Sequence, residues 1–266
     1  MHVPSRSRTS LIKGLARRKI REREGLFLAE GVRVVEDLLD SAVVPRFAIV
    51  SSSLGDTPRG RALVERLGGA CEVERVSPGE LAGLAETEAA QGVLVAAETP
   101  RYRLDALRLN SSDVVLLLDA VQDPGNAGTL VRTADAMGCA AVLMLPGTVD
   151  PWNPKVVRAA AGSLFRVPIV EADVETSAAW AREQRASVLA GDARGRPIDE
   201  IELRGPIVLA VGNEGAGLGE AVSSLASTLV AIPIRGSAES LNVAVAAGIL
   251  LYETTRRLLA ATEAGD

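Results

Sequence analysis

The residue types best suited to chemistry lie in three short segments of the second half of this 266-residue chain. The first segment, residues 123–134, contains Asn126 and Arg132. Asn126 is the expected N-cap of an amphipathic helix, which places Arg132 in the second helical turn. A guanidinium there opposes the helix dipole, so the position is mildly unfavourable unless the side chain serves another purpose. The alternative, a surface cation paired with Asp135, stays open.

The second segment, residues 211–218, reads VGNEGAGL and follows an apolar run typical of a buried strand. Its glycines permit a close approach of the backbone to a ligand and left-handed backbone conformations. The spacing differs from Gly-x-Gly-x-x-Gly, and no Gly-Lys-Ser or Gly-Lys-Thr occurs, so a phosphate-binding loop is disfavoured. Taken alone, the segment also fits an ordinary turn between a strand and a helix.

The third segment, residues 232–243, begins where an apolar run ends at a proline and continues as a polar loop. Ser240 or Asn242 is expected to cap a long helix whose apolar residues include Val245, Ile249 and Tyr252. Capping accounts for one of the two polar residues but not for both.

Six short apolar runs predict the strands that position these segments. Helical patterns separate most of the runs, which predicts an α/β fold with a mostly parallel sheet and helices on both faces. The polar segments follow the carboxyl ends of strands, where ligands bind in such sheets. The expected strands are residues 114–119, 141–145, 167–170, 188–190, 207–211 and 229–232.

The first half of the chain predicts a smaller α/β domain over residues 1–97, followed by a linker at 98–112 and a catalytic domain at 113–266. Residues 77–80 read as a helix start with serine as N-cap, proline at the first helical position and glutamate at the third. The remaining expected elements are helices near 32–39 and 58–67 and strands at 47–50, 72–76 and 92–97.

The net charge of −5 hides a strong asymmetry. Residues 1–33 hold nine Lys and Arg against three Glu, a net charge of +6, so the remainder of the chain carries −11. This segregation favours a local contact with nucleic-acid phosphate, although a solvated amphipathic helix explains it equally well. Only 3% of the residues are aromatic, which leaves few side chains for stacking unpaired bases.

Several function classes are disfavoured by composition. One histidine, His2, and two separate cysteines, Cys71 and Cys139, form no metal-ligand pattern and no Ser-His-Asp or Cys-His catalytic set. No apolar run is long enough to span a bilayer, and no apolar stretch follows the basic N-terminus as a secretory signal requires. A cytoplasmic protein with free thiols and without a metal is therefore expected.

Together and in this order, the three segments resemble the motifs of the SpoU (TrmH) branch of the SPOUT methyltransferases. Asn126 and Arg132 match the first motif, residues 212–215 with Leu218 match the second, and residues 240–244 match the third. The resemblance covers roughly residues 112–258. Residues 10–97 are similar, mainly through segment 23–31, to the L30e-like substrate-binding domain that often precedes the catalytic domain.

The resemblance implies a SPOUT-type parallel sheet with a deep trefoil knot, S-adenosylmethionine as methyl donor, and a homodimer with its active site at the subunit interface. It implies a catalytic arginine supported by neighbouring polar residues, and a family-like segment at 153–163 adds basic residues to those of the N-terminus. The implied catalytic residues are Arg132, Asn126, Glu214, Ser240 and Asn242. The implied cofactor-binding residues are Val211, Gly212, Asn213, Ile232, Ile234 and Leu241. The expected RNA-binding residues are Arg17, Arg18, Lys19, Arg21, Lys155 and Arg158.

These expectations favour an RNA 2′-O-ribose methyltransferase that acts on 23S ribosomal RNA. A tRNA 2′-O-methyltransferase and a catalytically inactive RNA-binding protein are the alternatives. A nucleotide-dependent α/β enzyme would need the phosphate-binding loop that the sequence lacks.

Overall fold

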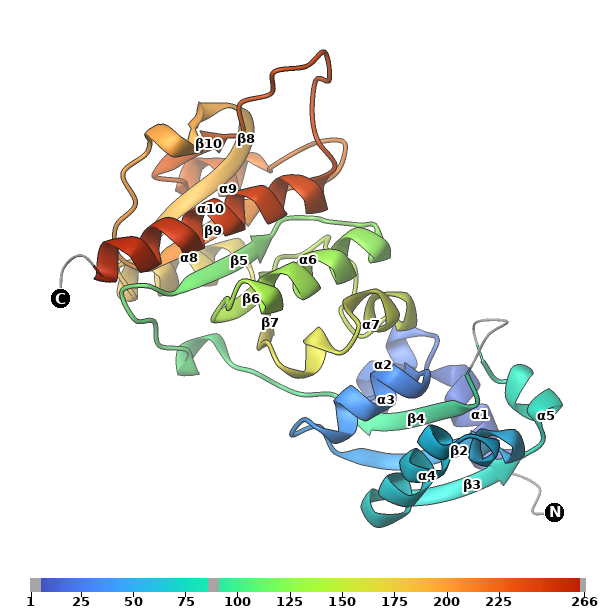
Figure 1. The fold of residues 1–266 in the computed structure, drawn as a ribbon. Helices are drawn as coiled ribbons and strands as arrows, with labels where there is room; N and C mark the ends of the chain where they lie inside the picture. The colour runs from blue at the N-terminus through green and yellow to red at the C-terminus, as the bar shows by residue number, and fades with distance from the viewer. Residues whose placement is uncertain (1–5, 86–90, 264–266) are drawn as a thin grey trace. The chain divides into compact units, whose positions relative to one another are not determined.

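The computed structural model describes residues 6–85 and 91–263, which form two compact units. The first unit contains the residues up to Pro100 together with Asp150–Arg166, and the second contains Arg101–Val149 and the residues from Val167 onward (Figure 1). The predicted division at residues 97 and 113 placed all of 150–166 in the catalytic domain. The division of the chain into 1–97, 98–112 and 113–266 stays a prediction. The segment Asp150–Arg166, which that division assigns to the catalytic domain, belongs to the first unit.

The first unit is built on a mixed four-stranded sheet in the order β1-β4-β2-β3. Strand β4 is antiparallel to both β1 and β2, and β2 is parallel to β3. The strands are β1 (Leu26–Glu30), β2 (Pro45–Ser51), β3 (Glu72–Val76) and β4 (Val93–Glu98). The helices are α1 (Arg6–Gly14), α2 (Arg18–Glu24), α3 (Val32–Leu39), α4 (Pro58–Ala70), α5 (Pro78–Ala82) and α7 (Pro154–Ala160), with short 3₁₀ turns at Ser52–Asp56 and Ser163–Phe165.

The capping pattern predicted at Ser77 is present at the start of α5. The Ser77 side chain accepts from the Glu80 backbone N–H, and the Glu80 carboxylate accepts from the Ser77 backbone N–H at 2.8 Å. The expected helices and strands between residues 32 and 97 are confirmed within about three residues. Strand β1 and helices α1 and α2 were not predicted as elements, because their periodicity is short and β1 is buried along its whole length.

Helix α7 and the residues around it pack against β1. The Phe27 ring lies 4.7 Å from the Trp152 ring and 5.7 Å from the Phe165 ring, measured between centroids. Glu30, which is buried at the end of β1, pairs with Arg158 of α7 at 3.7 Å. The insertion at 150–166 therefore supplies part of the hydrophobic core of the first unit.

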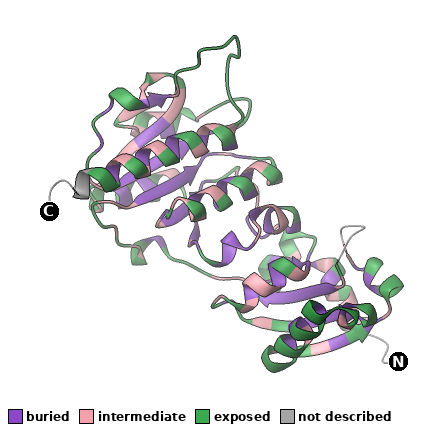
Figure 2. Ribbon diagram, viewed as in Figure 1, coloured by how far each residue is buried: buried purple, intermediate pink, exposed green. Residues whose placement is uncertain are grey.

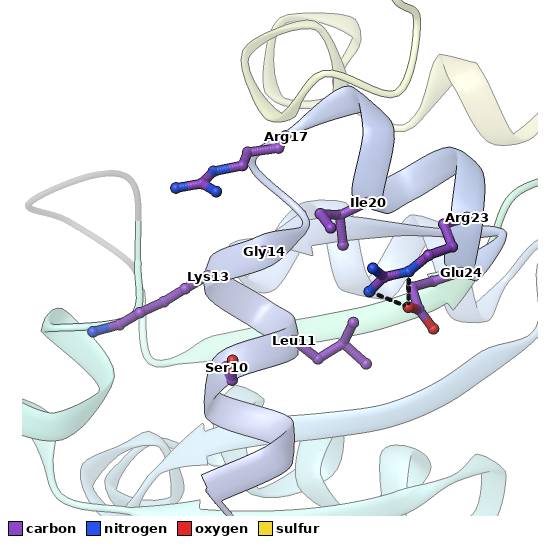
Figure 3. A pocket seen from close by; sticks show the side chains of 8 residues that line it. All are labelled: Ser10, Leu11, Lys13, Gly14, Arg17, Ile20, Arg23 and Glu24. Atoms are coloured by element: carbon purple, nitrogen blue, oxygen red, sulfur yellow. Dashed lines mark hydrogen bonds and ion pairs between the residues drawn. The ribbon is translucent and has the colours of Figure 1, made fainter.

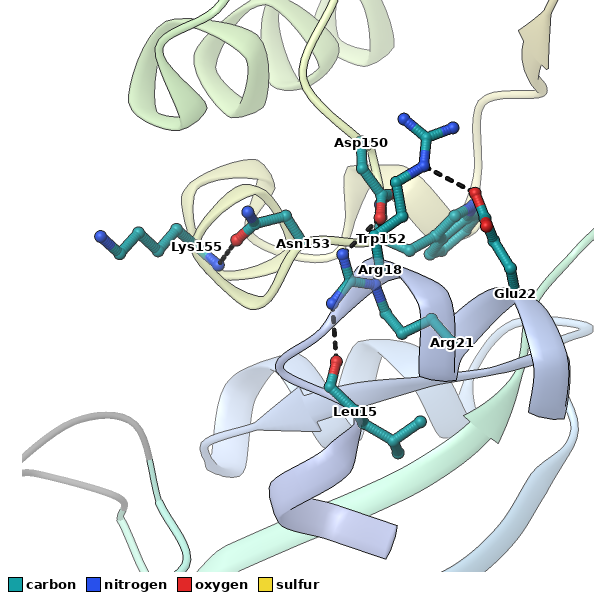
Figure 4. Close-up of polar contacts among 8 residues, drawn as sticks. All are labelled: Leu15, Arg18, Arg21, Glu22, Asp150, Trp152, Asn153 and Lys155. Carbon is teal, nitrogen blue, oxygen red and sulfur yellow. Dashed lines mark hydrogen bonds and ion pairs between the residues drawn. The ribbon is translucent and has the colours of Figure 1, made fainter.

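A buried arginine joins the N-terminal helices to this insertion (Figure 4). The Arg21 side chain is only 4% exposed, and its guanidinium donates both to Asp150 and to the Leu15 carbonyl oxygen at 2.6 Å. Asp150 also accepts from the Trp152 backbone N–H at 2.8 Å. Each charged group in this cluster is thus paired, as burial of charge requires.

The second unit is built on a six-stranded sheet in the order β10-β8-β9-β5-β6-β7, in which every pair is parallel. Buried residues concentrate in the strands and on the helix faces turned toward them (Figure 2). The strands are β5 (Val114–Leu118), β6 (Ala141–Met144), β7 (Ile169–Glu171), β8 (Ser187–Pro197), β9 (Ile207–Val211) and β10 (Thr228–Ala231). The helices are α6 (Pro124–Ala136), α8 (Val174–Glu183), α9 (Glu220–Leu225) and α10 (Val243–Glu263), with 3₁₀ turns at Leu104–Ala106 and Ile198–Glu200.

The α/β prediction is confirmed, and so is the parallel sheet of the second half. The ends of β5, β9 and β10, at the same edge of this sheet, lead into the polar segments that were expected to carry chemistry. None of the helices in residues 6–85 and 91–263 is long and apolar enough to cross a membrane. The trefoil knot is a property of how the chain threads through itself, which strand order does not test, and it stays a prediction.

Replacing Asp150 with alanine is expected to lower the free energy of unfolding by about 3 kcal/mol, because the Arg21 charge would stay buried without its partner. Denaturant titration measures this loss. Glu22→Ala is the control, since the Arg18–Glu22 pair is more than half exposed and should contribute less than about 1 kcal/mol. Equal losses in the two variants would contradict a structural role for the buried pair.

Candidate active site

The segment after β9 folds into a closed loop that only glycine permits at its base. Backbone hydrogen bonds of 2.8 and 2.9 Å join Asn213 and Gly217 in both directions. The Asn213 side chain accepts from the N–H groups of Gly215 and Ala216, both at 2.9 Å. A Cβ atom at Gly212 would collide with the backbone of Gly217 and Leu218, so no other residue fits there. The alternative of an ordinary turn does not account for this close crossing of backbone segments.

This loop forms one wall of a cleft of about 340 Å³. The other walls come from residues 191–193 of β8, from the loop after β10 and from the first turns of α10. A cleft of this size falls in the range of about 300–1,000 Å³ found for small-molecule sites. All six residues predicted to bind the cofactor line it, together with two predicted catalytic residues: Val211, Gly212, Asn213, Ile232, Ile234, Leu241, Glu214 and Ser240.

Two further predicted residues, Asn242 and Asn126, are joined to Glu214 by a chain of hydrogen bonds beside this cleft. Asn242 is the N-cap of α10, since its side-chain oxygen accepts from the backbone N–H groups of Ala244 and Val245 at 2.9 and 3.3 Å. Its amide nitrogen donates to the Asn126 side-chain oxygen at 3.0 Å. The Asn126 amide nitrogen in turn donates to Glu214 at 3.0 Å. The chain has one possible direction, because backbone N–H groups only donate and a carboxylate only accepts.

The expected cap at Asn126 is wrong. Helix α6 begins at Pro124, and its N-cap is Asp123, whose side chain accepts from the Asn126 backbone N–H at 2.7 Å. Proline suits the first helical position, and aspartate caps as well as asparagine, so the helix starts three residues earlier. The Asn126 side chain is thereby left to bridge Glu214 and Asn242.

The Glu214 carboxylate accepts hydrogen bonds from four donors. They are the Asn126 and Asn213 amides and the backbone N–H groups of Gln122 and Asp123, at 3.0–3.4 Å. Burial alone would raise the pKa of Glu214, but the hydrogen bonds from Asn126 and from the backbone outweigh it and hold the pKa below its usual value. Glu214 is therefore ionised at neutral pH and is a weak base.

Arg132 does not line the cleft of a single chain. Its side chain is exposed on α6, and within the described residues it makes no hydrogen bond or ion pair. Because α6 begins earlier than predicted, Arg132 lies in its third turn, where the helix dipole is weak and does not disfavour a guanidinium. An exposed cation without an internal partner is available to a ligand or to another chain.

Asp192 is a cleft residue that sequence reasoning missed. Hydrogen bonds from the Arg194 side chain and backbone lower the pKa of Asp192 to about 2. The apolar run at 188–190 suggested that the strand ended there, whereas β8 continues to Pro197. The polar residue after that run was the signal that could have identified it.

The six predicted RNA-binding residues have different environments. Arg17, Lys19 and Lys155 are exposed, and their side chains have no hydrogen bond or ion pair within residues 6–85 and 91–263. Arg18 is exposed but bound to Glu22 at 2.7 Å, and Arg158 pairs with Glu30. The prediction is wrong for Arg21, whose buried guanidinium is fully engaged inside the first unit and is not available to an RNA phosphate.

The described residues contain no group of three or more His, Cys, Asp or Glu placed to bind a metal ion. Both cysteines are free thiols. Burial raises the pKa of Cys139 to about 12 and also raises that of Cys71, so neither is a reactive thiolate at neutral pH.

Comparison with known proteins agrees with this arrangement. The model of the SpoU rRNA Methylase family matches residues 113–252, more than half of the chain. The chain belongs to the SpoU rRNA methylase family. A second family model, the MRM3-like substrate binding domain, matches residues 8–95 of this family member. The resemblance of the three segments is thereby confirmed.

Two relatives are similar over almost the whole of this SpoU-family chain. The 23S rRNA (guanosine(2553)-2′-O)-methyltransferase RlmP of Bacillus subtilis is 36% identical over 90% of this chain and 92% of its own. The 23S rRNA (uridine(2479)-2′-O)-methyltransferase of Streptomyces viridochromogenes is 32% identical over 91% and 87%.

Solved structures of the family are similar over the same extent. The AdoMet-bound rRNA methyltransferase from Sinorhizobium meliloti has a TM-score of 0.87 at 30% identity and covers 97% of both chains. The SpoU methyltransferase AviRb from Streptomyces viridochromogenes, in complex with AdoMet, has a TM-score of 0.88 at 29% identity and covers 96% of this chain and 99% of its own.

Glu214→Gln is expected to destabilise the protein at neutral pH but not in acid. The folded pKa lies below the ordinary value of 4.5, so the stabilising contribution of Glu214 is complete above about pH 4.5. It is lost as the pH falls through the folded pKa. The difference in unfolding free energy between the wild type and Glu214→Gln should therefore be constant from about pH 6 to 8 and shrink below about pH 4.5.

Denaturant titrations over this pH range provide the measurement. Glu65→Gln is the matched control, because Glu65 is an exposed glutamate of α4 without a hydrogen bond in the described structure. If the difference in unfolding free energy between the wild type and Glu214→Gln stays unchanged in acid, the negative charge of Glu214 is not the source of the stabilisation by its four donors.

Proposed function

We propose that this chain transfers the methyl group of S-adenosylmethionine to a ribose 2′-hydroxyl of 23S ribosomal RNA. The observation that carries the proposal is that the second and third family segments line one cleft. Asn126 of the first segment is joined to them by hydrogen bonds of fixed direction with Glu214 and Asn242. The names of both near-full-length relatives describe this reaction. A tRNA substrate and a binding protein without activity are tested by the experiments below.

The residues of the cleft fit S-adenosylmethionine, which is bound in two similar structures. Val211, Ile232, Ile234 and Leu241 offer apolar surface, and the loop around Gly212 brings backbone polar groups to the cleft wall. When bound, this cofactor supplies an electrophilic methyl group on a positively charged sulfur.

The chemistry left to the chain is to bring the hydroxyl group into line and to manage its proton. Arg132 cannot act as a base, because an arginine guanidinium keeps its proton in proteins. Its exposed guanidinium instead contacts the hydroxyl or the neighbouring phosphate and stabilises developing negative charge. Hydrogen bonds among Glu214, Asn126 and Asn242 fix the loops of the site relative to one another, and Ser240 orients the ribose. The resulting alignment of the hydroxyl group with the methyl group supplies much of the rate.

A homodimer would complete this site. Helix α10 exposes Val245, Ile249 and Tyr252 at helical spacing, with exposed fractions of 52%, 40% and 57%. An apolar stripe of this kind marks an interaction surface. Arg132 lies outside the cleft of its own chain, and an active site at the interface between two copies accounts for that position.

A 23S rRNA substrate also implies where the protein works. Ribosomes are assembled in the cytoplasm of bacteria, and the proposal therefore includes a cytoplasmic location.

The proposal is tested by incubating the protein with S-adenosylmethionine labelled in its methyl group and with either 23S rRNA or tRNA, then mapping the modified ribose. Arg132→Ala is expected to lower kcat by at least about 100-fold, the usual effect of removing one charge-stabilising donor, while its affinity for the cofactor stays near that of the wild type. Arg182→Ala, an exposed arginine of α8, is the matched control and should keep full activity.

The other outcomes point to the alternatives. Label in tRNA alone would replace the ribosomal substrate, RNA binding without label would indicate an inactive binding protein, and full activity of Arg132→Ala would remove Arg132 from the mechanism.

Ile249→Asp is expected to convert a dimer into a monomer, because a charge would be buried at the centre of the apolar stripe. Light scattering after gel filtration measures the mass. Val44→Asp, at an apolar residue of the first unit that is 50% exposed, makes the same change elsewhere and should leave the dimer intact. A wild-type monomer, or a dimer in Ile249→Asp, would contradict the proposed interface.

A further inference from the structure

A second pocket, of about 550 Å³, lies between helices α1 and α2 of the first unit. It shares no residue with the cleft of the second unit. Lys13 and Arg17 extend on one side of it, while the Arg23–Glu24 pair lies on the other (Figure 3). The pocket is thus lined by three cationic side chains and one carboxylate.

Two of these positive charges have no counter-charge bound to them within residues 6–85 and 91–263. Arg23 is bound to Glu24 at 2.7 Å, which satisfies both groups. The side chains of Lys13 and Arg17 are exposed and have no hydrogen bond or ion pair within the described part of the chain. In contrast, Arg59 and Arg66 of α4 are exposed but paired with carboxylates. The excess positive charge at this pocket is suited to an anionic ligand.

The remaining wall is apolar but contains no aromatic ring. Leu11 and Ile20 face the pocket, and both are only partly buried by the core of the first unit. The volume lies in the range of about 300–1,000 Å³ that holds small molecules or parts of larger ones. A ligand that fits both walls carries a phosphate on one side and a flat or apolar group on the other, as a nucleotide does.

We propose that this pocket holds one nucleotide of the RNA substrate, with its phosphate on Lys13 and Arg17 and its base or ribose against Leu11 and Ile20. The inference rests on the proposed function and adds a defined contact to it. No charged side chain of the pocket is buried, so a ligand must order flexible cations, which a free mononucleotide does poorly. A polynucleotide offsets that cost through further phosphate contacts. Without an aromatic platform the contact is largely independent of the base.

The test measures binding of the full-length protein to 23S rRNA, transcribed in vitro, on filters over a series of salt concentrations. Lys13→Ala combined with Arg17→Ala is expected to weaken binding roughly tenfold at low salt. The plot of log affinity against log salt should become flatter by about 0.7, because the two cations share one phosphate of a single strand.

The matched control is Arg66→Ala combined with Arg75→Ala, which removes two exposed cations of the same unit outside the pocket. Affinity and slope should stay at the wild-type values. An equal loss in both double variants would mean that overall charge, and not this pocket, attracts RNA, and would overturn the proposal.

A filling variant separates occupancy from charge. Ser10 is exposed on α1 and lines the pocket, so Ser10→Leu narrows it while every cation stays in place. RNA binding should weaken in this variant too, and wild-type affinity would overturn the proposal.

Calorimetric binding of S-adenosylmethionine by each variant checks that the protein is folded. If the wild type binds no RNA, the proposed function itself fails; if it binds RNA and the variants bind equally well, only the pocket fails. Retention of an acidic peptide in place of RNA would assign the pocket to a protein partner.

Discussion

Two side-chain hydrogen bonds of fixed direction bring together stretches of chain that lie 88 and 116 residues apart. The direction is imposed at the start of α10, where two backbone N–H groups occupy the oxygen of Asn242 and leave its amide nitrogen to donate. Asn126 must accept that bond and then donate to Glu214. Reversing either amide would set donor against donor or acceptor against acceptor, so the arrangement has one low-energy form.

These hydrogen bonds also fix the loops around the cleft relative to one another. Glu214 also accepts from the backbone after β5, and the buried Asp119 at the end of that strand accepts from Gly219 at 2.7 Å. The loops after β5 and β9 are therefore joined by polar contacts at two places. Because these contacts form within one chain, the shape of the cleft does not depend on a ligand to organise it.

The sequence was most informative where burial is uniform. The strands β5, β6 and β9 are continuous apolar runs in the interior of a parallel sheet, and they were predicted within one residue. Strand β8 was predicted too short, since its second half contains no buried residue and carries no apolar pattern. At the start of α6 the prediction chose Asn126 as the cap, whereas Asp123 caps the helix and Pro124 occupies the first helical position. The distant partner that the Asn126 side chain binds instead, Glu214, has no local signal in the sequence.

Long-range pairing also explains the error at Arg21. A short basic helix at the N-terminus reads as a charged surface, and the partner that draws Arg21 inside lies 129 residues away. Nothing near Asp150 in the sequence indicates that it belongs with the first unit. Arg17 and Lys19 in the same segment are exposed cations, as the charge distribution predicted.

The placement of Asp150–Arg166 in the first unit means that the polypeptide passes between the two units three times, after Pro100, after Val149 and after Arg166. A domain attached by a single crossing can be exchanged between genes by one recombination event. Here such an exchange would separate Phe27 from Trp152 and Phe165 and leave both partners without their packing. The two halves of this gene are therefore constrained to change together, with the aromatic cluster and the Arg21–Asp150 pair as the positions where a mismatched combination would first lose stability.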